Sequence, residues 1–141
     1  MVAPALGRAY WAISGIGAYK EVQAEQAVQI HVSDENDKAH PYRVLASKSH
    51  MNPDTANFIS SLGETVLLQA GSSLNFCLVA EGTADIYPRM GLTSEWDTAA
   101  AQVVVEAAGG QVLSLEGVPL RYGKRDVLNP YFIVSGSRPY R

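Results

Sequence analysis

The 141-residue sequence has a single cysteine, no long apolar run and no concentration of charge of one sign. Cys77 has no second cysteine for an internal disulfide, and no His/Cys group has the spacing of zinc ligands, so the sequence favours a reducing compartment. No stretch approaches the roughly 18 consecutive apolar residues of a membrane helix, and no secretory signal is recognisable. We therefore expect a cytoplasmic location without a transmembrane segment, with peripheral contact to the inner face of the cell membrane left open.

Charge is nearly balanced, with 11 Lys and Arg against 14 Asp and Glu and a formal net charge of −3. These residues are scattered singly, so the basic stripe that binds a phosphate backbone is absent and a nucleic-acid polymer is excluded as the expected partner. An apolar fraction of 47% and a charged fraction of 18% are typical of a globular protein. A chain of this length buries enough surface to fold around its own core.

Strand patterns are frequent along the chain. Arg8–Ile13 and Ala18–Val22 flank a glycine turn and predict a hairpin, which begins without any preceding partner strand. Further strands are predicted at Val28–Val32, Tyr42–Ala46, Glu64–Leu68, Ala84–Tyr87, Val112–Leu115, Val118–Tyr122 and Phe132–Ser135. Pro88 is expected to close the strand that precedes it.

Helices alternate with these strands. The sequence predicts one from Asn52-Pro53 to Gly63, one from Ser72 or Ser73 to Ala80, and a long one over Glu95–Ala108, capped by Thr93 or Ser94. The alternation predicts an α/β fold in which helices cover a mixed β-sheet. We expect residues 1–27 to complete a sheet that lies elsewhere, and residues 28–141 to form the α/β domain.

The longest predicted helix carries a recognisable motif. Trp96-Asp97 opens it, small and aliphatic residues follow, and Gly109-Gly110 closes it. This segment resembles the second signature of the inositol monophosphatase superfamily. Further segments resemble its 3'(2'),5'-bisphosphate nucleotidase branch, among them Ala46-Ser47-Lys48-Ser49-His50, Gly71-Ser72-Ser73-Leu74 and Ile86-Tyr87-Pro88-Arg89.

The resemblance covers nearly the whole chain but only the second half of the family pattern. The first signature, Asp-Pro-Ile/Leu-Asp-Gly-Thr, and an upstream glutamate that also binds metal do not occur, and Val2–Ala5 is similar to the strand after that signature. The resemblance therefore implies the carboxy-terminal half of the layered αβαβα sugar-phosphatase fold. We expect this half to be inactive alone and to associate with itself or with an amino-terminal half.

The activity implied by the resemblance is that of a Mg²⁺-dependent phosphomonoesterase. It would remove the 3'-phosphate of 3'-phosphoadenosine 5'-phosphate and leave AMP, using a metal-activated water. The residue that activates the water would lie outside this chain. Two alternatives are an inositol-1-monophosphatase-like phosphatase and a noncatalytic half-domain that needs a partner.

Asp97 is the one metal ligand that the resemblance assigns here, and it would also lie near the substrate. As an alternative, Asp97 interacts with Ser94 and the positive end of the helix dipole. His50 would contact the nucleotide, or be an ordinary solvated histidine. Burial in the core is the better interpretation of Trp96 and Cys77.

The remaining candidates would bind phosphate or ribose. Gly71 and Ser72 lie where a strand leads into a helix, so their N–H groups could hold an anion, or Ser72 could simply cap the helix. Arg89 could grip the second phosphate with two hydrogen bonds, or pair with a surface carboxylate. Asn75 stands where the nucleotidase branch usually carries lysine, so a weaker hold on a bisphosphate is expected.

Overall fold

The structure is a computed structural model of the 141-residue chain. It describes residues 2–3, 8–13, 16–22, 26–33, 40–46, 52–69, 72–90, 93–120, 128–129, 131–137 and 140. Within these ranges the side chains of residues 2–3, 8, 72–73, 93–98, 100 and 128–129 are not described.

The first sheet is antiparallel and has the order β1-β2-β3-β4. Its strands are β1 (Val2–Ala3), β2 (Arg8–Ile13), β3 (Gly17–Val22) and β4 (Val28–Ile30). Strands β2 and β3 form the predicted hairpin, with Ala12 opposite Ala18. Strand β4 pairs with β3, so this sheet continues past residue 27. The division of the chain at that residue stays a prediction.

The second sheet is mixed and has the order β6-β5-β7-β11-β9. Its strands are β5 (Tyr42–Leu45), β6 (Thr65–Leu68), β7 (Ile86–Arg89), β9 (Gln111–Ser114) and β11 (Phe132–Ser135). Strand β5 runs parallel to β6 and β7, whereas β11 runs antiparallel to β7 and β9. The predicted mixed sheet is therefore confirmed.

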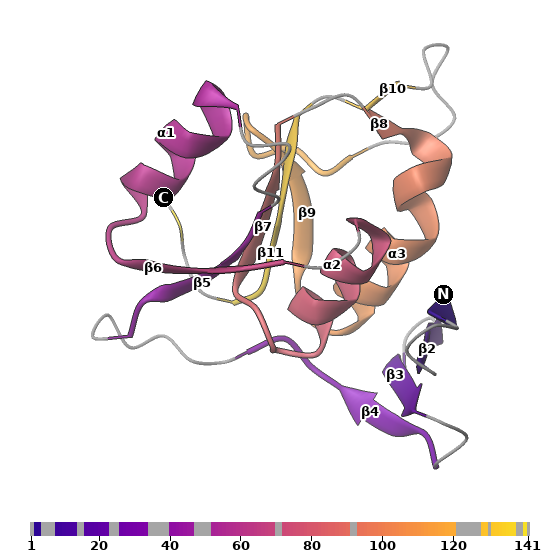
Figure 1. Ribbon diagram of the computed structural model, residues 1–141. Helices are drawn as coiled ribbons and strands as arrows, with labels where there is room; N and C mark the ends of the chain where they lie inside the picture. The colour runs from indigo at the N-terminus through magenta and orange to yellow at the C-terminus, as the bar shows by residue number, and fades with distance from the viewer. Residues whose placement is uncertain are drawn as a thin grey trace.

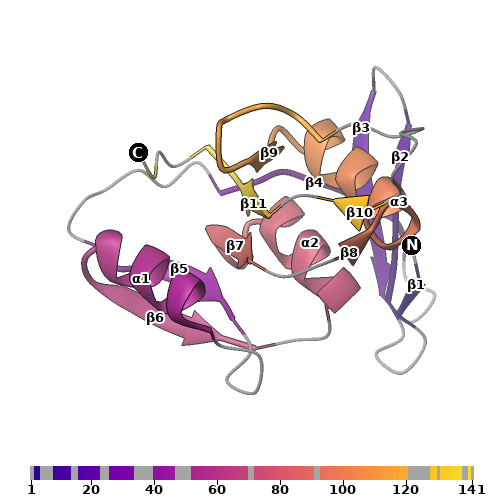
Figure 2. The same cartoon turned by 90° about the horizontal axis from the view of Figure 1, so that it is seen from above.

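Three helices cover the second sheet. Helix α1 (Pro53–Ser61) lies on one face, and α2 (Ser72–Ala80) and α3 (Glu95–Ala107) lie on the other, between the two sheets (Figures 1 and 2). The layers are thus α1, the mixed sheet, the α2–α3 pair and the antiparallel sheet, as the layered α/β prediction requires. No helix within the described ranges combines the length and apolar character needed to cross a membrane.

Helix α1 begins and ends where local sequence chemistry predicts. The Oδ1 atom of Asn52 accepts a hydrogen bond from the backbone N–H of Thr55 at 2.8 Å, and Pro53 occupies the first turn, where a missing N–H costs nothing. Gly63 has φ of 84°, a left-handed conformation that favours glycine and stops the helix.

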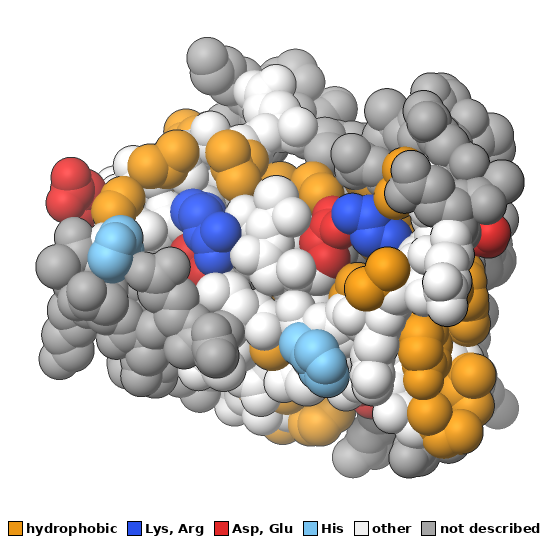
Figure 3. Space-filling view, turned by 90° about the horizontal axis from the view of Figure 1, so that it is seen from below, with side chains coloured by type: hydrophobic (Ala, Val, Ile, Leu, Met, Phe, Trp, Pro, Cys, Tyr) orange, Lys and Arg blue, Asp and Glu red, His pale blue; other side chains and the backbone are white. Residues whose placement is uncertain are grey.

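Two ion pairs lie at the end of the molecule where β7 starts, one between layers and one within the mixed sheet. Lys20 and Tyr10 of the antiparallel sheet both bind the carboxylate of Glu81, just after α2. Arg43 pairs with Asp85. Figure 3 views the molecule from below the orientation of Figure 1 and shows basic beside acidic side chains at two places.

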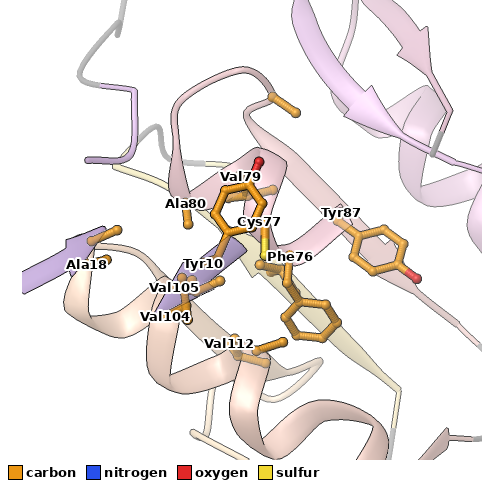
Figure 4. Close-up of a cluster of buried hydrophobic side chains, with 14 of the residues drawn as sticks. Tyr10, Ala18, Phe76, Cys77, Val79, Ala80, Tyr87, Val104, Val105 and Val112 are labelled. Atoms are coloured by element: carbon orange, nitrogen blue, oxygen red, sulfur yellow. The ribbon is translucent and has the colours of Figure 1, made fainter. Parts of the chain in front are cut away.

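The main core lies between the sheets, around α2 and α3 (Figure 4). The ring of Phe76 packs against those of Tyr87 and Phe132, with centroid distances of 5.8 Å in both pairs. Truncating a buried phenylalanine such as Phe132 costs about 3–5 kcal/mol, whereas a part-exposed ion pair contributes about 1 kcal/mol or less. Apolar packing therefore dominates the cohesion of the layers.

Four details differ from the predictions. The hairpin does have a preceding partner strand, because β1 pairs with β2. Pro88 does not close its strand but lies inside β7, opposite Ile133. A proline is tolerated there because β7 pairs with β5 only at Ile86, which leaves one side of the strand unpaired at Pro88. Where the hairpin arm Val118–Tyr122 was predicted, the described part forms an isolated bridge between Leu113 and Pro119. The short pair of β8 (Thr93–Ser94) with β10 (Leu128–Asn129) was not predicted.

Candidate functional site

Three parallel strands end at the same edge of the mixed sheet. Strand β5 ends at Leu45, β6 at Leu68 and β7 at Arg89. We call this the carboxyl edge. Open α/β sheets bind their ligands outside the carboxyl ends of the strands, so this edge is the first place to look for a site.

Two helices begin near the same edge. Helix α2 starts at Ser72, after β6, and α3 starts at Glu95, after β7 and the short strand β8. The first backbone N–H groups of a helix have no partner within the helix, and the helix dipole favours negative charge there. The carboxyl edge therefore offers donors suited to an anion.

Arg89 is the last residue of β7, and its side chain turns toward the α2 layer. It lies directly opposite Phe132 of β11, and opposed residues in an antiparallel pair point to the same face. Phe132 in turn contacts Phe76 of α2. The Nε atom of Arg89 is buried and has no hydrogen-bond partner among the described residues. Buried N–H donors in proteins are normally hydrogen-bonded, so we expect an acceptor for this one.

Asn75 lies in the first turn of α2, on the same face of the sheet as Arg89. Its side chain is 5% exposed, and its Oδ1 atom has no hydrogen-bond partner within the described part of the chain. An amide offers one acceptor oxygen and two N–H donors. Asn75 and Arg89 thus each have a buried polar atom without a partner among the described residues, on the α2 side of the mixed sheet. Such atoms destabilise the fold unless water or a ligand forms hydrogen bonds with them, so they indicate a binding site.

Ser135 also has a buried oxygen without a partner among the described residues, but it belongs elsewhere. It lies opposite Ile86, at the start of β7, so it is at the far end of the strand from Arg89. It is therefore not part of the candidate site.

Cys77 is fully buried in α2, as predicted. Burial raises the pKa of its thiol to about 12, with a smaller contribution from the negative charge of Glu81. A thiol with this pKa is almost entirely protonated at neutral pH and is a poor nucleophile. The structure gives it a packing role.

The other predicted site residues are placed only by their elements. Asp97 is the third residue of α3, and Ser72 is the first of α2; neither side chain is described. His50 and Gly71 lie outside the described residues. Their roles stay predictions, although the elements that flank them, β5, α1, β6 and α2, converge on the carboxyl edge.

A magnesium site needs several oxygen ligands, usually carboxylates and water. Within the described ranges, no three His, Cys, Asp or Glu side chains gather closely enough to hold a metal ion. The described residues alone therefore do not fit a complete magnesium site. The carboxylate predicted to take part, Asp97, is outside this test.

The fold and the carboxyl edge define a known class of protein. Residues 1–138 match the inositol monophosphatase family, and the chain belongs to that family. The resemblance that the motifs indicated is therefore confirmed.

The chain is also similar to individual members of this family. The chain is 44% identical over 134 residues to the 3'(2'),5'-bisphosphate nucleotidase CysQ of Escherichia coli (strain K12), covering 94% of this chain and 52% of that protein. The crystal structure of CysQ from Bacteroides thetaiotaomicron matches with a TM-score of 0.82 and 37% identity, over 96% of this chain and 56% of that one. A staphylococcal IMPase-II, at 16% identity and a TM-score of 0.64, shares the fold.

The chain thus spans about half the length of the curated relatives it matches. This agrees with the prediction that the sequence corresponds to one half of the family pattern. The sequence also indicated Asn75 and Arg89. It did not predict that each would have a buried polar atom without a partner among the described residues, because that depends on how α2 packs against β7 and β11.

Proposed function

We propose that the protein carrying this chain is a 3'(2'),5'-bisphosphate nucleotidase that hydrolyses the 3'-phosphate of 3'-phosphoadenosine 5'-phosphate to AMP. The observation that carries the proposal is the buried Nε of Arg89 at the carboxyl edge, which has no partner among the described residues, in a chain that is 44% identical to the CysQ nucleotidase of Escherichia coli. A phosphate oxygen is the acceptor that would satisfy this guanidinium with a charge-assisted hydrogen bond.

In this proposal the carboxyl edge holds the nucleotide. Arg89 binds one phosphate, and the amide of Asn75 donates to the same phosphate or accepts from a ribose hydroxyl. The N–H groups at Gly71 and Ser72 bind a further oxygen, as helix starts do. His50 contacts the nucleoside.

Magnesium would supply a metal-activated water and stabilise the leaving oxygen. Asp97 would contribute one carboxylate, and the remaining ligands would come from outside the described residues. We therefore expect the 141-residue chain alone to bind Mg²⁺ weakly. The base that activates the water is likewise assigned to the rest of the protein.

The test is a substrate panel on the complete protein with saturating Mg²⁺. Release of inorganic phosphate is measured from 3'-phosphoadenosine 5'-phosphate and from inositol 1-phosphate at equal concentrations. We expect kcat/KM for the nucleotide to exceed that for the inositol ester by at least about a hundredfold, since the ester lacks the second phosphate and the base. Preference for inositol 1-phosphate would instead support the inositol-monophosphatase alternative.

A second candidate function is that of a noncatalytic half-domain that needs a partner. The outward face of the antiparallel sheet favours it: Trp11 and Tyr19 stack there with ring centroids 6.1 Å apart, and Ile13 beside them is 45% exposed. Their neighbours Tyr10 and Ala18 point the other way, into the core. An apolar face of this kind suits self-association or contact with an amino-terminal half.

Two measurements test the half-domain proposal. The purified 141-residue chain should release no phosphate above the metal-only background, and its sedimentation coefficient should rise with concentration. Ile13→Lys should abolish the concentration dependence, whereas Val103→Lys, at a residue that is 56% exposed on α3, should not. Phosphate release by the chain alone, or a strictly monomeric chain, would refute it.

A cytoplasmic location is part of the proposal and rests on the single cysteine, which has no second cysteine for an internal disulfide. Nothing among the described residues supports contact with the inner face of the membrane, so we do not propose it.

A further inference from the structure

A groove lies on the α1 face of the mixed sheet, and the proposed nucleotide site does not use it. Its volume is about 460 Å³, which is in the range of small-molecule sites. Its lining residues are Asp54, Asn57, Phe58, Met90, Leu115, Tyr131, Ile133 and Tyr140. We call this the α1 groove.

The α1 groove is separated from Arg89 and Asn75 by the sheet itself. Ile133 lines the groove and packs with Phe58 and Tyr140 in the apolar cluster under α1. Its neighbour Phe132 points to the opposite face, where Arg89 and α2 lie. Successive residues of a strand alternate between faces, so the two sites are on opposite sides of the sheet.

Aromatic rings form the walls of the groove. Phe58 and Tyr140 meet nearly at right angles, with ring centroids 6.0 Å apart and an interplanar angle of 70°. Tyr131 also lines the groove. The faces of aromatic rings carry partial negative charge and attract cations, and walls of several rings are how proteins recognise quaternary ammonium groups.

Among the described residues that line the groove, the only charged side chain is a carboxylate. It belongs to Asp54, which is exposed in the first turn of α1. The helix dipole accounts for a carboxylate at this position but not for three aromatic rings around the same space. A carboxylate together with aromatic faces is complementary to a cation with an apolar surface.

We propose that the α1 groove binds a small organic cation of the trimethylammonium or alkylammonium class. The rings contact the apolar surface of the cationic head, Asp54 balances its charge, and Asn57 at the rim hydrogen-bonds a polar substituent. The site acts independently of phosphate hydrolysis, since it uses none of the residues assigned to the nucleotide.

The test compares choline with its neutral carbon isostere, 3,3-dimethylbutan-1-ol, by titration calorimetry and NMR on the complete protein. The two probes match in shape and hydroxyl group and differ in charge. We expect choline to bind at least about tenfold more tightly, which corresponds to the contribution of one desolvated cation–π contact and one carboxylate. Equal affinities, or no detectable binding of choline, would overturn the proposal.

Variants locate the binding. Asp54→Asn should weaken choline binding about tenfold and leave the alcohol unchanged, whereas Glu64→Gln, an exposed carboxylate outside the groove, should change neither. Tyr131→Leu should weaken choline binding and Tyr131→Phe should restore it, because the ring rather than the hydroxyl is required. Circular dichroism checks that each variant is folded. Choline affinity unaffected in folded Asp54→Asn and Tyr131→Leu would show that the cation binds elsewhere.

Discussion

The guanidinium of Arg43 on β5 holds the buried carboxylate of Asp85, with Nη2 to Oδ1 at 3.0 Å and Nε to Oδ2 at 3.3 Å. The backbone N–H of Arg43 donates to the same Oδ2 at 2.8 Å, and the N–H of Asp85 donates to the Arg43 carbonyl at 2.9 Å. The regular pairing of β5 with β7 consists of one register position, Val44 opposite Ile86. The Arg43–Asp85 pair therefore supplies much of the polar attachment between these two strands.

Removing the arginine should destabilise the fold. Arg43→Leu leaves the carboxylate of Asp85, whose side chain is 2% exposed, with the backbone N–H of residue 43 but without its charge partner. Because Arg43 itself is 33% exposed, solvent moderates the loss, and we expect the free energy of unfolding to fall by about 2 kcal/mol in urea titrations. The double variant Arg43→Leu/Asp85→Asn should lose less than the sum of the single losses. Additive losses would mean that the two side chains do not stabilise each other.

Restoring a positive charge at the start of α2 should strengthen nucleotide binding. In the complete enzyme, Asn75→Lys should lower KM for 3'-phosphoadenosine 5'-phosphate about tenfold, because a charge-assisted hydrogen bond exceeds a neutral one by about 1.4 kcal/mol. Asn57→Lys adds the same charge on the other face of the sheet and should leave KM unchanged. A KM that does not respond to Asn75→Lys would remove Asn75 from the phosphate site.

Stability at high pH should depend on Cys77. Its pKa is raised by burial from 9.0 to about 12, so the folded state keeps a proton that the unfolded state releases above pH 9. The stabilisation that the protonated thiol contributes is therefore fully present below pH 9. As the pH rises from 9 toward 12, the free energy of unfolding falls by about 1.4 kcal/mol per pH unit.

The measurement is the free energy of unfolding of the wild type and of Cys77→Ala between pH 8 and 11. The wild type should lose stability more steeply than the variant. Lysine and tyrosine titrate in both proteins, so the difference between the two pH profiles reports on Cys77. In the folded protein at pH 8, the thiol should resist a disulfide reagent until denaturant is added. Parallel pH profiles would contradict the assigned pKa.

The second glycine of the closing Gly-Gly pair should be required for packing. A Cβ at Gly110 would lie 2.7 Å from the carbonyl oxygen of Ser135 and 2.9 Å from a methyl carbon of Val105. We expect Gly110→Ala to lower the free energy of unfolding by about 2–3 kcal/mol. Gly63→Ala serves as the control: at φ of 84° with open space around it, it should cost about 1 kcal/mol from backbone conformation alone. A smaller effect at Gly110 than at Gly63 would show that the backbone adjusts.

Local features of the fold were predictable because the chemistry that decides them lies within a few residues. The Asn52 cap, Pro53 in the first turn and Gly63 at the end determine α1 by themselves. The glycine turn likewise determines the β2–β3 hairpin. The family motifs identified the class of protein, which capping and turn preferences cannot identify.

The sequence proposed residues for the candidate site but could not predict the environment of those that the structure describes. Arg89 and Asn75 could be selected from the motifs, yet the burial of Arg89 Nε and Asn75 Oδ1 without partners among the described residues depends on Phe76 of α2 meeting Phe132 of β11. The position of Pro88 inside β7 was unpredictable for the same reason. The proline is tolerated because β5 does not pair with β7 at that residue, and this depends on how the sheet is assembled.

By itself, then, the sequence determined helices α1 to α3 and their ends, the β2–β3 hairpin, the strands of the mixed sheet and the family, because these depend on propensity, capping and motif. Tertiary structure alone decided the strand order, the Arg43–Asp85 attachment across 42 residues of chain and the α1 groove, where α1, β11 and residue Tyr140 meet. Those features depend on contacts between distant segments. Such contacts follow from the combined burial of both faces of the sheet rather than from any single stretch of residues.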